Sequence, residues 1–318
     1  MQRRNFLAAS LALPTALAAT TTAPASEPRT SAPGNFKVSL KGDAIGLNLG
    51  AEEQLDAAIK TGYDALSVPG WWVADWSKAQ RMDFAKKAKD NGISWGANGL
   101  PIDFRKTQEQ YDKELAALPR EAAHLRELGI TRIGTWIISS HDTLTYNENM
   151  RLHADRLRGA AQVLKKEGID LGLEYLGTTA VRQMGRFAFL STGKELRELI
   201  TLIGEPNVGV VLDSYHWYTA RETAADLKAW KPEQIIAVDL NDANAQLTLD
   251  QQTDVARELP LATGVIDIVS FLKTLHEMGY AGPVRAEPFS STLNGMKDEL
   301  AIQATYDAVT MAIEKALG

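Results

Sequence analysis

The amino-acid sequence predicts an α/β fold, specifically a (β/α)8 TIM barrel, on three observations. From Val38 onward, short apolar runs alternate with amphipathic, charged stretches, a pattern typical of strands followed by helices. Eight such repeats occupy roughly 280 residues, the usual length of this barrel. The competing doubly wound sheet needs a G-x-G-x-x-G loop after an early strand, and the segment 46–50, Gly-Leu-Asn-Leu-Gly, lacks that spacing.

The barrel strands are predicted at the apolar runs 44–48, 65–68, 93–98, 132–138, 170–176, 208–213, 235–240 and 284–287. The amphipathic stretches predict helices over 51–61, 77–91, 106–128, 147–167, 194–203, 267–278 and 295–317. A glycine lies near the end of several helices, where a left-handed residue stops the helix and lets a strand follow: Gly62, Gly92, Gly129, Gly168, Gly204 and Gly279.

Residues 1–25 are predicted to be a twin-arginine export signal, because Arg3 and Arg4 precede an apolar stretch over 6–19. Small-x-small cleavage patterns follow at 16–18 and 23–25. The alternative is an uncleaved membrane anchor, but this stretch is shorter than the ~20 residues that a span requires. We expect a periplasmic or secreted protein with no stable membrane insertion after cleavage, a flexible lead-in over 26–36 and the barrel over 37–318.

Composition narrows the chemistry. With 318 residues, 45% hydrophobic and 23% charged, the chain has the make-up of a globular protein. The formal net charge of −6 argues against a nucleic-acid partner, which normally meets a basic patch. The absence of cysteine excludes disulfides, thiolate catalysis and sulfur-ligated metals, so any metal must bind oxygen or imidazole. The sequence leaves the oligomeric state open, a homo-oligomer included.

Four consecutive predicted strands each end in a carboxylate after an apolar run: Glu174, Asp213, Asp239 and Glu287. Chemistry in such barrels lies at the carboxyl ends of the strands, so we expect the four to converge there. Their mutual repulsion predicts a divalent metal, Mn²⁺ or Mg²⁺ first, with Co²⁺ or Zn²⁺ possible. Any one acid taken alone has a second interpretation, as a solvent-facing strand end or a helix cap. We expect a structural role for Asp242 in the loop after the seventh strand.

The segments around these acids read Leu-Glu-Tyr at Glu174, Asp-Ser-Tyr-His from Asp213 to His216, Val-Asp-Leu-Asn-Asp at Asp239 and Ala-Glu-Pro-Phe at Glu287. Together they resemble the xylose isomerase-like barrels, the sugar phosphate isomerase/epimerase family. The resemblance runs from about Val38 to the end of the chain. One departure is that many relatives carry His where this chain has Asp239, which shifts the expected preference toward Mn²⁺ or Mg²⁺. Another is Leu-Ala-Thr at 261–263, where relatives often carry a Gly-acid-Gly turn.

The resemblance implies a reaction. A metal held by the four acids would bind a hydroxy-ketone and acidify the neighbouring C–H, and the catalytic pair Glu174 and Glu287 would remove and return the proton. It also implies that Arg257 contacts the substrate. Further substrate contacts are expected from side chains at the same mouth, namely His216, His141, Trp71 and Trp72. His124, His153 and His276 lie on predicted helices and are expected at the surface.

Three functions remain open. The first is an exported, metal-dependent sugar isomerase or epimerase acting on a keto-sugar or hydroxy-ketone through an enediolate. The alternative is a metal-dependent lyase or dehydratase acting on a 3-keto-glycoside or related keto-sugar, because elimination shares the first step. The second alternative is a barrel that binds sugar without catalysis, for which the Asp239 departure is the best support. A phosphodiesterase of the same fold would need several His-rich metal sites, which five histidines, mostly on helices, do not supply.

Overall fold

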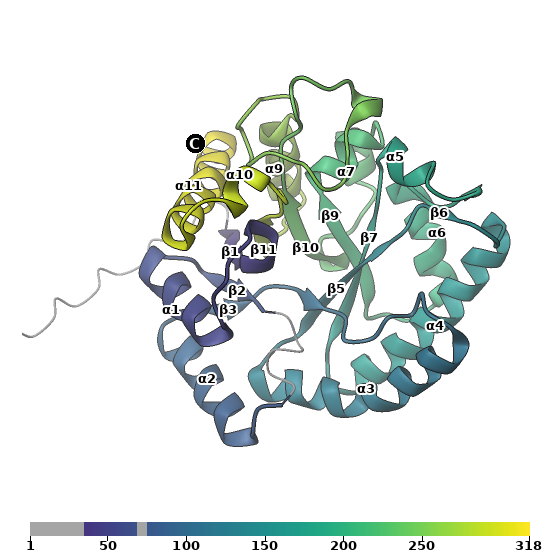
Figure 1. Ribbon diagram of the computed structural model, residues 1–318, viewed down its shortest axis with the longest axis horizontal. Helices are drawn as coiled ribbons and strands as arrows, with labels where there is room; N and C mark the ends of the chain where they lie inside the picture. Colours follow the sequence, from purple (N-terminus) through teal and green to yellow (C-terminus); the bar gives the residue numbers. More distant parts are fainter. Residues whose placement is uncertain (1–34, 69–74) are drawn as a thin grey trace, which may run out of the picture. The chain divides into compact units, whose positions relative to one another are not determined.

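The structure, a computed structural model, describes residues 35–68 and 75–318. Its main sheet has nine strands, all paired in parallel, in the order β3-β2-β1-β11-β10-β9-β7-β5-β4. The two ends of that order, β3 (Ser94–Trp95) and β4 (Asn98–Gly99), are consecutive pieces of one predicted strand. The sheet therefore curves round into a nearly closed barrel, with helices around the strands (Figure 1). The predicted (β/α)8 TIM barrel is confirmed.

The other barrel strands are β1 (Lys37–Lys41), β2 (Ala65–Ser67), β5 (Arg132–Ile137), β7 (Asp170–Tyr175), β9 (Val208–Asp213), β10 (Ile235–Leu240) and β11 (Pro283–Ala286). A separate antiparallel pair is formed by β6 (Ser140–His141) and β8 (Phe187–Ala188). The long helices are α1 (Ala51–Thr61), α2 (Lys78–Asp90), α3 (Gln108–Leu128), α4 (Tyr146–Lys166), α6 (Gly193–Ile203), α9 (Ile268–Glu277) and α11 (Asp298–Leu317).

Short helices decorate the loops: α5 (Thr179–Arg182), α7 (Ser214–Thr219), α8 (Ala224–Leu227) and α10 (Ser291–Asn294), with 3-10 turns at Gly42–Ile45, Pro232–Gln234 and Leu249–Gln251. The predicted glycine stops are confirmed, since all six of those glycines have positive φ, between 67° and 104°. In the described part of the chain no helix is long and apolar enough to cross a membrane.

The first barrel strand lies earlier than the sequence predicts. The predicted strand 44–48 instead holds the end of a 3-10 turn followed by Gly46, whose φ of 73° cannot continue a strand. The true strand, β1, has the sequence Lys-Val-Ser-Leu-Lys and therefore shows alternation rather than an apolar run. Phe36, at the end of the predicted lead-in, is fully buried and packs against Tyr280. The packed barrel thus begins by Phe36.

Small side chains fill the barrel beneath its mouth. Ala97, Val211 and Ala237 form a separate buried apolar cluster. Gly172 on β7 makes room for it, because a Cβ there would lie 2.8 Å from a Val211 methyl and 2.9 Å from the Cβ of Ile236. Ala97 and Val211 also line the cavity above, so this cluster forms part of its floor.

The prediction that His153 lies at the surface is wrong. This side chain on α4 is 7% exposed and packs between the rings of Phe104 and Phe189. Its Nδ1 lies 2.9 Å from the carbonyl oxygen of Asn149, one turn earlier. Burial is the main cause that lowers the pKa of His153 to about 4, so the ring is neutral at physiological pH. His276 is exposed and His124 is half-buried.

Candidate active site

The four acids singled out from the sequence lie at the carboxyl ends of neighbouring strands. Glu174 is on β7, Asp213 ends β9, Asp239 is on β10 and Glu287 directly follows β11. Asp213 and Asp239 are register partners and both are fully buried, while Glu287 is 8% exposed. Neighbouring carboxylates that are buried from solvent repel one another unless positive charge compensates them.

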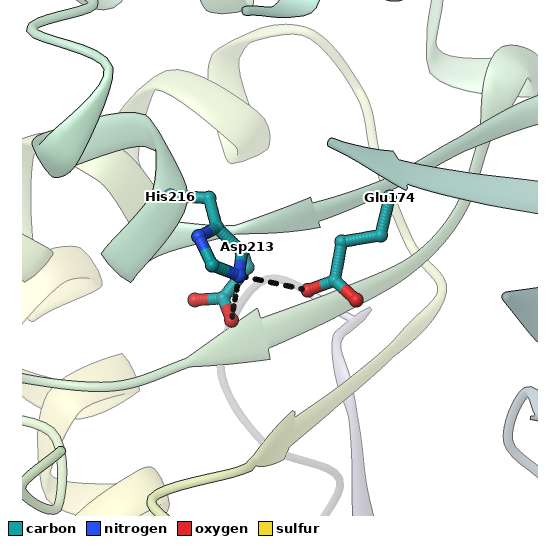
Figure 2. A group of neighbouring side chains, drawn as sticks. All are labelled: Glu174, Asp213 and His216. Carbon is teal, nitrogen blue, oxygen red and sulfur yellow. Dashed lines mark ion pairs between the residues drawn. The ribbon is translucent and has the colours of Figure 1, made fainter. Parts of the chain in front are cut away.

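Glu174 has the one carboxylate oxygen of this group that is buried without a hydrogen-bond partner among the described residues, its Oε1. Figure 2 shows this carboxylate pointing from β7 toward Asp213 and His216. The Nε2 atom of His216 lies 3.7 Å from Glu174 Oε1 and 4.0 Å from Asp213 Oδ2. Burial first, and then the charges of Glu287, Asp213 and Asp239, raise the pKa of Glu174 well above its ordinary value. The raised pKa makes the Glu174 carboxylate a stronger proton acceptor than an ordinary carboxylate.

His216 is neutral and lies among charged groups. Its Nδ1 accepts a hydrogen bond from the backbone N–H of Gly177 at 3.2 Å. Burial, and then the charge of Arg257, lower the pKa of His216 well below its ordinary value. Its Nε2 lies 3.3 Å from Arg257 Nη2 and 3.4 Å from Asp254 Oδ1. Each ring nitrogen thus faces an N–H donor, and Nε2 also lies near the carboxylates of Asp254 and Glu174.

Arg257 reaches the same centre from the loop between β10 and α9. Its Nη1 donates to Asp213 Oδ2 at 2.6 Å and to Glu287 Oε2 at 3.3 Å. Its guanidinium also lies over the rings of Tyr215 and Phe289. Although Arg257 lowers it, burial raises the pKa of Asp213 to about 7. The residue expected to contact substrate therefore lies at the centre of the acidic group and binds two of its members.

Asp239 is paired with Arg285, which the sequence analysis missed. The two are register partners on β10 and β11, and the guanidinium holds both carboxylate oxygens, Nε to Oδ1 at 2.5 Å and Nη2 to Oδ2 at 3.1 Å. The remaining nitrogen, Nη1, donates to the Ala97 carbonyl at 2.6 Å and to Ser67 Oγ at 3.2 Å. A signal was available, because an arginine inside the apolar strand Pro-Val-Arg-Ala needs a buried partner.

Lys41 is the second missed residue. It ends β1, and its Nζ lies 3.1 Å from Glu287 Oε1 and 3.1 Å from Asp43 Oδ1. Burial alone would raise the pKa of Glu287, but Lys41, Arg257 and Arg285 outweigh it and lower this pKa below the ordinary value. Because the first strand was predicted at 44–48, Lys41 was not expected at a strand end.

Amide groups hold the acids in place. Asn241 donates to both oxygens of Asp213, at 3.0 and 3.1 Å, and accepts from the backbone N–H of Glu287. Asp242, for which the sequence favours a structural role, accepts the backbone N–H groups of Thr263, Gly264 and Ile266. This carboxylate therefore orders the loop before α9.

A cavity of about 860 Å³ opens over this centre. Its lining includes Glu174, Glu287, Lys41 and Arg285 of this centre, and also Trp136, which is 50% exposed. The lining also includes Asn98 on β4, whose side chain is buried and whose amide oxygen and nitrogen both lack a partner among the described residues. The cavity thus combines ionised groups, an aromatic face and an unsatisfied amide.

One of the residues predicted to contact substrate, His141, lies away from this geometry. His141 is on β6, its Nδ1 accepts backbone N–H groups of Thr143 and Leu144, and it does not line the cavity. Trp71 and Trp72 lie outside the described residues. The structure therefore brings together Glu174, Asp213, His216, Asp239, Arg257 and Glu287.

Two groups of three ligand atoms are close enough to hold a metal ion, each within 4.8 Å: Glu174, Asp213 and His216, and Glu174, Asp239 and Glu287. The donor types therefore suit a cation. Among the described residues, however, only Glu174 has a buried ligand oxygen without a hydrogen-bond partner. Arg285 binds both oxygens of Asp239, Arg257 and Asn241 bind Asp213, and Lys41 and Arg257 bind Glu287. The Nε2 of His216 lies 3.3 Å from Arg257 Nη2. These contacts do not fit a resident divalent ion held by all four carboxylates.

Fold and site together define a (β/α)8 barrel with a buried ionic centre at the carboxyl ends of its strands. The family model described as xylose isomerase-like TIM barrel matches residues 55–308. The chain belongs to this family.

The similar curated proteins are named as sugar isomerases and epimerases. Inosose isomerase of Bacillus velezensis is 19% identical over 84% of this chain and 94% of its own length. For inosose isomerase of Halalkalibacterium halodurans the identity is 23% over 55% of this chain, and the match spans 59% of that protein. D-Psicose 3-epimerase of Agrobacterium fabrum is 24% identical over 54% of this chain and 61% of its own length.

Solved structures share the fold. A xylose isomerase domain protein from Alicyclobacillus acidocaldarius is 29% identical and superposes with a TM-score of 0.80 over 89% of this chain and 100% of its own. A structure described as IOLI protein with a binding zinc atom is 21% identical, with a TM-score of 0.75 over 88% of this chain and 99% of its own. A probable 3-DHS dehydratase from Bacillus anthracis is 12% identical, with a TM-score of 0.65 over 86% of this chain and 99% of its own.

Proposed function

We propose that this protein is an isomerase or epimerase of a small keto-sugar or related hydroxy-ketone. The single observation that carries the proposal is Glu174, whose buried Oε1 lacks a partner among the described residues while the carboxylate lines a cavity of about 860 Å³. A carboxylate with a raised pKa and a free oxygen suits removal of a proton from carbon next to a carbonyl. The names of the similar proteins support the same class.

The side chains divide the work. Glu174 takes the proton and can return it to the neighbouring carbon, which gives isomerisation. Epimerisation needs a proton delivered to the same carbon from the opposite face, and the ionised Glu287 could deliver it after taking up a proton from solvent. His216 and Arg257 face this centre and would hold substrate oxygens. The sequence predicts a metal-dependent reaction. Because Arg285 binds both oxygens of Asp239, this carboxylate does not favour metal dependence.

A second candidate reaction is elimination from a 3-keto-glycoside. The cavity is near the upper end of the ~300–1,000 Å³ range of ligand pockets, with room for more than one sugar ring. Besides the carboxylates of Glu174 and Glu287, its lining includes Trp136 and the unpartnered amide of Asn98, which a second ring or aglycone would contact. The same proton abstraction by Glu174 would then be followed by loss of the β-substituent.

Deuterium exchange tests both reactions. Purified protein is incubated in D₂O with a panel of keto-sugars and keto-glycosides, and label and products are followed by NMR and mass spectrometry. We expect label at a carbonyl-adjacent carbon, lost by at least about 100-fold in Glu174→Gln. Glu258→Gln is the matched control, because the contacts of Glu258 with Asp242 are made by its backbone. Absence of exchange with every substrate, with binding retained in Glu287→Gln, would indicate a sugar-binding barrel instead.

Export is a separate proposal. We infer that residues 1–25 direct twin-arginine export and that the mature protein works in the periplasm or outside the cell, on a free rather than a phosphorylated sugar. Fusion of 1–34 to a reporter that is active only after folded export tests this. We expect Arg3→Lys with Arg4→Lys to retain the reporter in the cytoplasm, and equal export of both forms would refute it.

A further inference from the structure

Protein cations already occupy the acidic centre. Arg257 binds Asp213 at 2.6 Å, Arg285 binds both oxygens of Asp239, and Lys41 binds Glu287 at 3.1 Å. Three of the four carboxylates predicted to hold a metal are thus each paired with a separate basic side chain. Four acids face three bases, so the group carries one net negative charge when all are ionised, and a proton on Glu174 removes it.

A divalent ion would disturb this balance. It would enter within a few ångströms of Lys41 and Arg257, where like charges repel by several kcal/mol in a partly buried site. To bind Asp239, the ion would also have to displace the guanidinium of Arg285. Arg285 is 5% exposed and would then be buried without a counter-ion. Breaking a buried pair from one side is strongly unfavourable.

The pairing also gives position 239 a role that requires a carboxylate. A histidine there could ligate a metal but could not neutralise a neighbouring arginine. Asp239 and Arg285 face each other across β10 and β11 in register, so the acid and the base form one unit. The same unit is anchored to β2 and to the third barrel strand through Ser67 and Ala97.

We propose that Lys41, assisted by Arg257, supplies the positive charge of this active site in place of a resident divalent metal. Lys41 is then a further catalytic residue. Its ammonium lines the cavity beside Glu287 and is 16% exposed, so a substrate oxygen can reach it. The role of Lys41 rests on the proposed function, whereas the absence of a metal from the centre does not.

The proposed step balances without a redox partner. Glu174 takes the C–H proton, the electron pair of that bond forms the C=C of an enediolate, and the carbonyl oxygen becomes an alkoxide. Lys41 donates a hydrogen bond to this oxygen, where the negative charge develops. For isomerisation, Glu174 gives its proton to the former carbonyl carbon, the proton of the neighbouring hydroxyl moves to the alkoxide, and a carbonyl forms at the carbon that was deprotonated. For epimerisation, a proton reaches the deprotonated carbon from the opposite face and the original carbonyl re-forms.

Metal binding by the unaltered chain is the direct test. The purified protein is dialysed against EDTA, its metal content is measured by mass spectrometry, and Mn²⁺ and Zn²⁺ are titrated by calorimetry. We expect far less than one ion per chain, no saturable binding at the centre and the same deuterium exchange with and without EDTA. One retained ion per chain, or exchange that is lost in EDTA and restored by metal, would overturn the proposal.

Variants test the two cations separately. Lys41→Gln should slow exchange by about 100-fold or more with the fold intact, and Lys41→Arg should recover part of it. Lys228→Gln is the matched control, since Lys228 Nζ is also 3.1 Å from a glutamate, Glu277, but the side chain is 53% exposed and does not line the cavity. Unchanged exchange in Lys41→Gln would refute the catalytic role.

The double variant Asp239→His with Arg285→Gln removes the pair together and supplies an imidazole. We expect its Zn²⁺ affinity to rise at least about 10-fold over the unaltered chain, with folding checked by circular dichroism. A folded double variant that binds no more Zn²⁺ would count against Arg285 as the group that excludes the metal. If no substrate shows exchange under any condition, the proposed function fails, while the metal measurements still decide whether the centre is metal-free.

Discussion

At the scale of single residues, the sequence predicted where the acidic side chains lie but not which basic side chains contact them. The ends of the apolar strands located Glu174, Asp213, Asp239 and Glu287, because a lone acid after a buried strand is visible in the sequence. Their partners come from distant segments: Glu287 meets Lys41, which is 246 positions earlier in the chain. No local pattern encodes such a contact, since it arises only when the barrel closes.

Asn98 provides a prediction at this scale. Its buried amide has no partner among the described residues and lines the cavity, so we expect it to bind a substrate hydroxyl. Asn98→Ala should raise KM about 10-fold, by loss of roughly 1–2 kcal/mol, without lowering the melting temperature. Asn207→Ala is the contrasting control, because the Asn207 amide binds the carbonyls of Ala161 and Ile169 and should affect stability only. A lower melting temperature with unchanged KM in Asn98→Ala would show a structural role.

At the scale of elements, the sequence located most strands and helices but misplaced one. Strands β9 and β10 and helix α1 have the predicted bounds, because each is a long run with a single period. Strand β1 was missed because its alternating residues Lys-Val-Ser-Leu-Lys lack a continuous apolar run. That error also hid Lys41, so one misplaced strand removed one residue from the predicted site.

Strand β7 contains a glycine that the barrel interior requires. In Gly172→Ala the added methyl would lie 2.8 Å from a Val211 methyl, which is overpacking inside a closed barrel. We expect a loss of about 1–3 kcal/mol in unfolding free energy by denaturant titration. Adding Val211→Ala should recover part of that loss, whereas Gly295→Ala, whose nearest contact would be 3.5 Å, should change little. A fully stable Gly172→Ala protein would contradict this packing.

Helix α4 carries a pH-dependent contribution to stability through His153. Its folded pKa, about 4, lies below the unfolded value of about 6.5, so the unfolded chain binds the proton more readily. The contribution is therefore complete above about pH 6.5 and is lost as pH falls toward 4, by about 3 kcal/mol in all. Denaturant titrations between these pH values should show a shallower slope in His153→Leu, and the exposed His276→Gln should leave it unchanged. An identical slope in His153→Leu would refute the assignment.

At the scale of the whole molecule, barrel closure depends on β1. The described chain begins at Asn35, and β1 pairs with both β2 and β11. We expect a chain that starts at residue 31 to melt at the temperature of the full chain. A chain that starts at residue 42 should fail to fold, because two strands would lose their partner. Cooperative melting of the shorter chain would show that the remaining strands close without β1.

By itself, the sequence determined the (β/α)8 fold, the family resemblance and the strands that bear the acids. These follow from local periodicity and from short motifs, which can be read from neighbouring residues of the sequence. Only the tertiary structure decided how the acids are neutralised. The strand ends predicted four carboxylates that bind a metal, and closure of the barrel instead brings Lys41, Arg257 and Arg285 onto three of them. A buried charge takes its partner from whichever element lies nearest in space, and sequence separation does not reveal that distance.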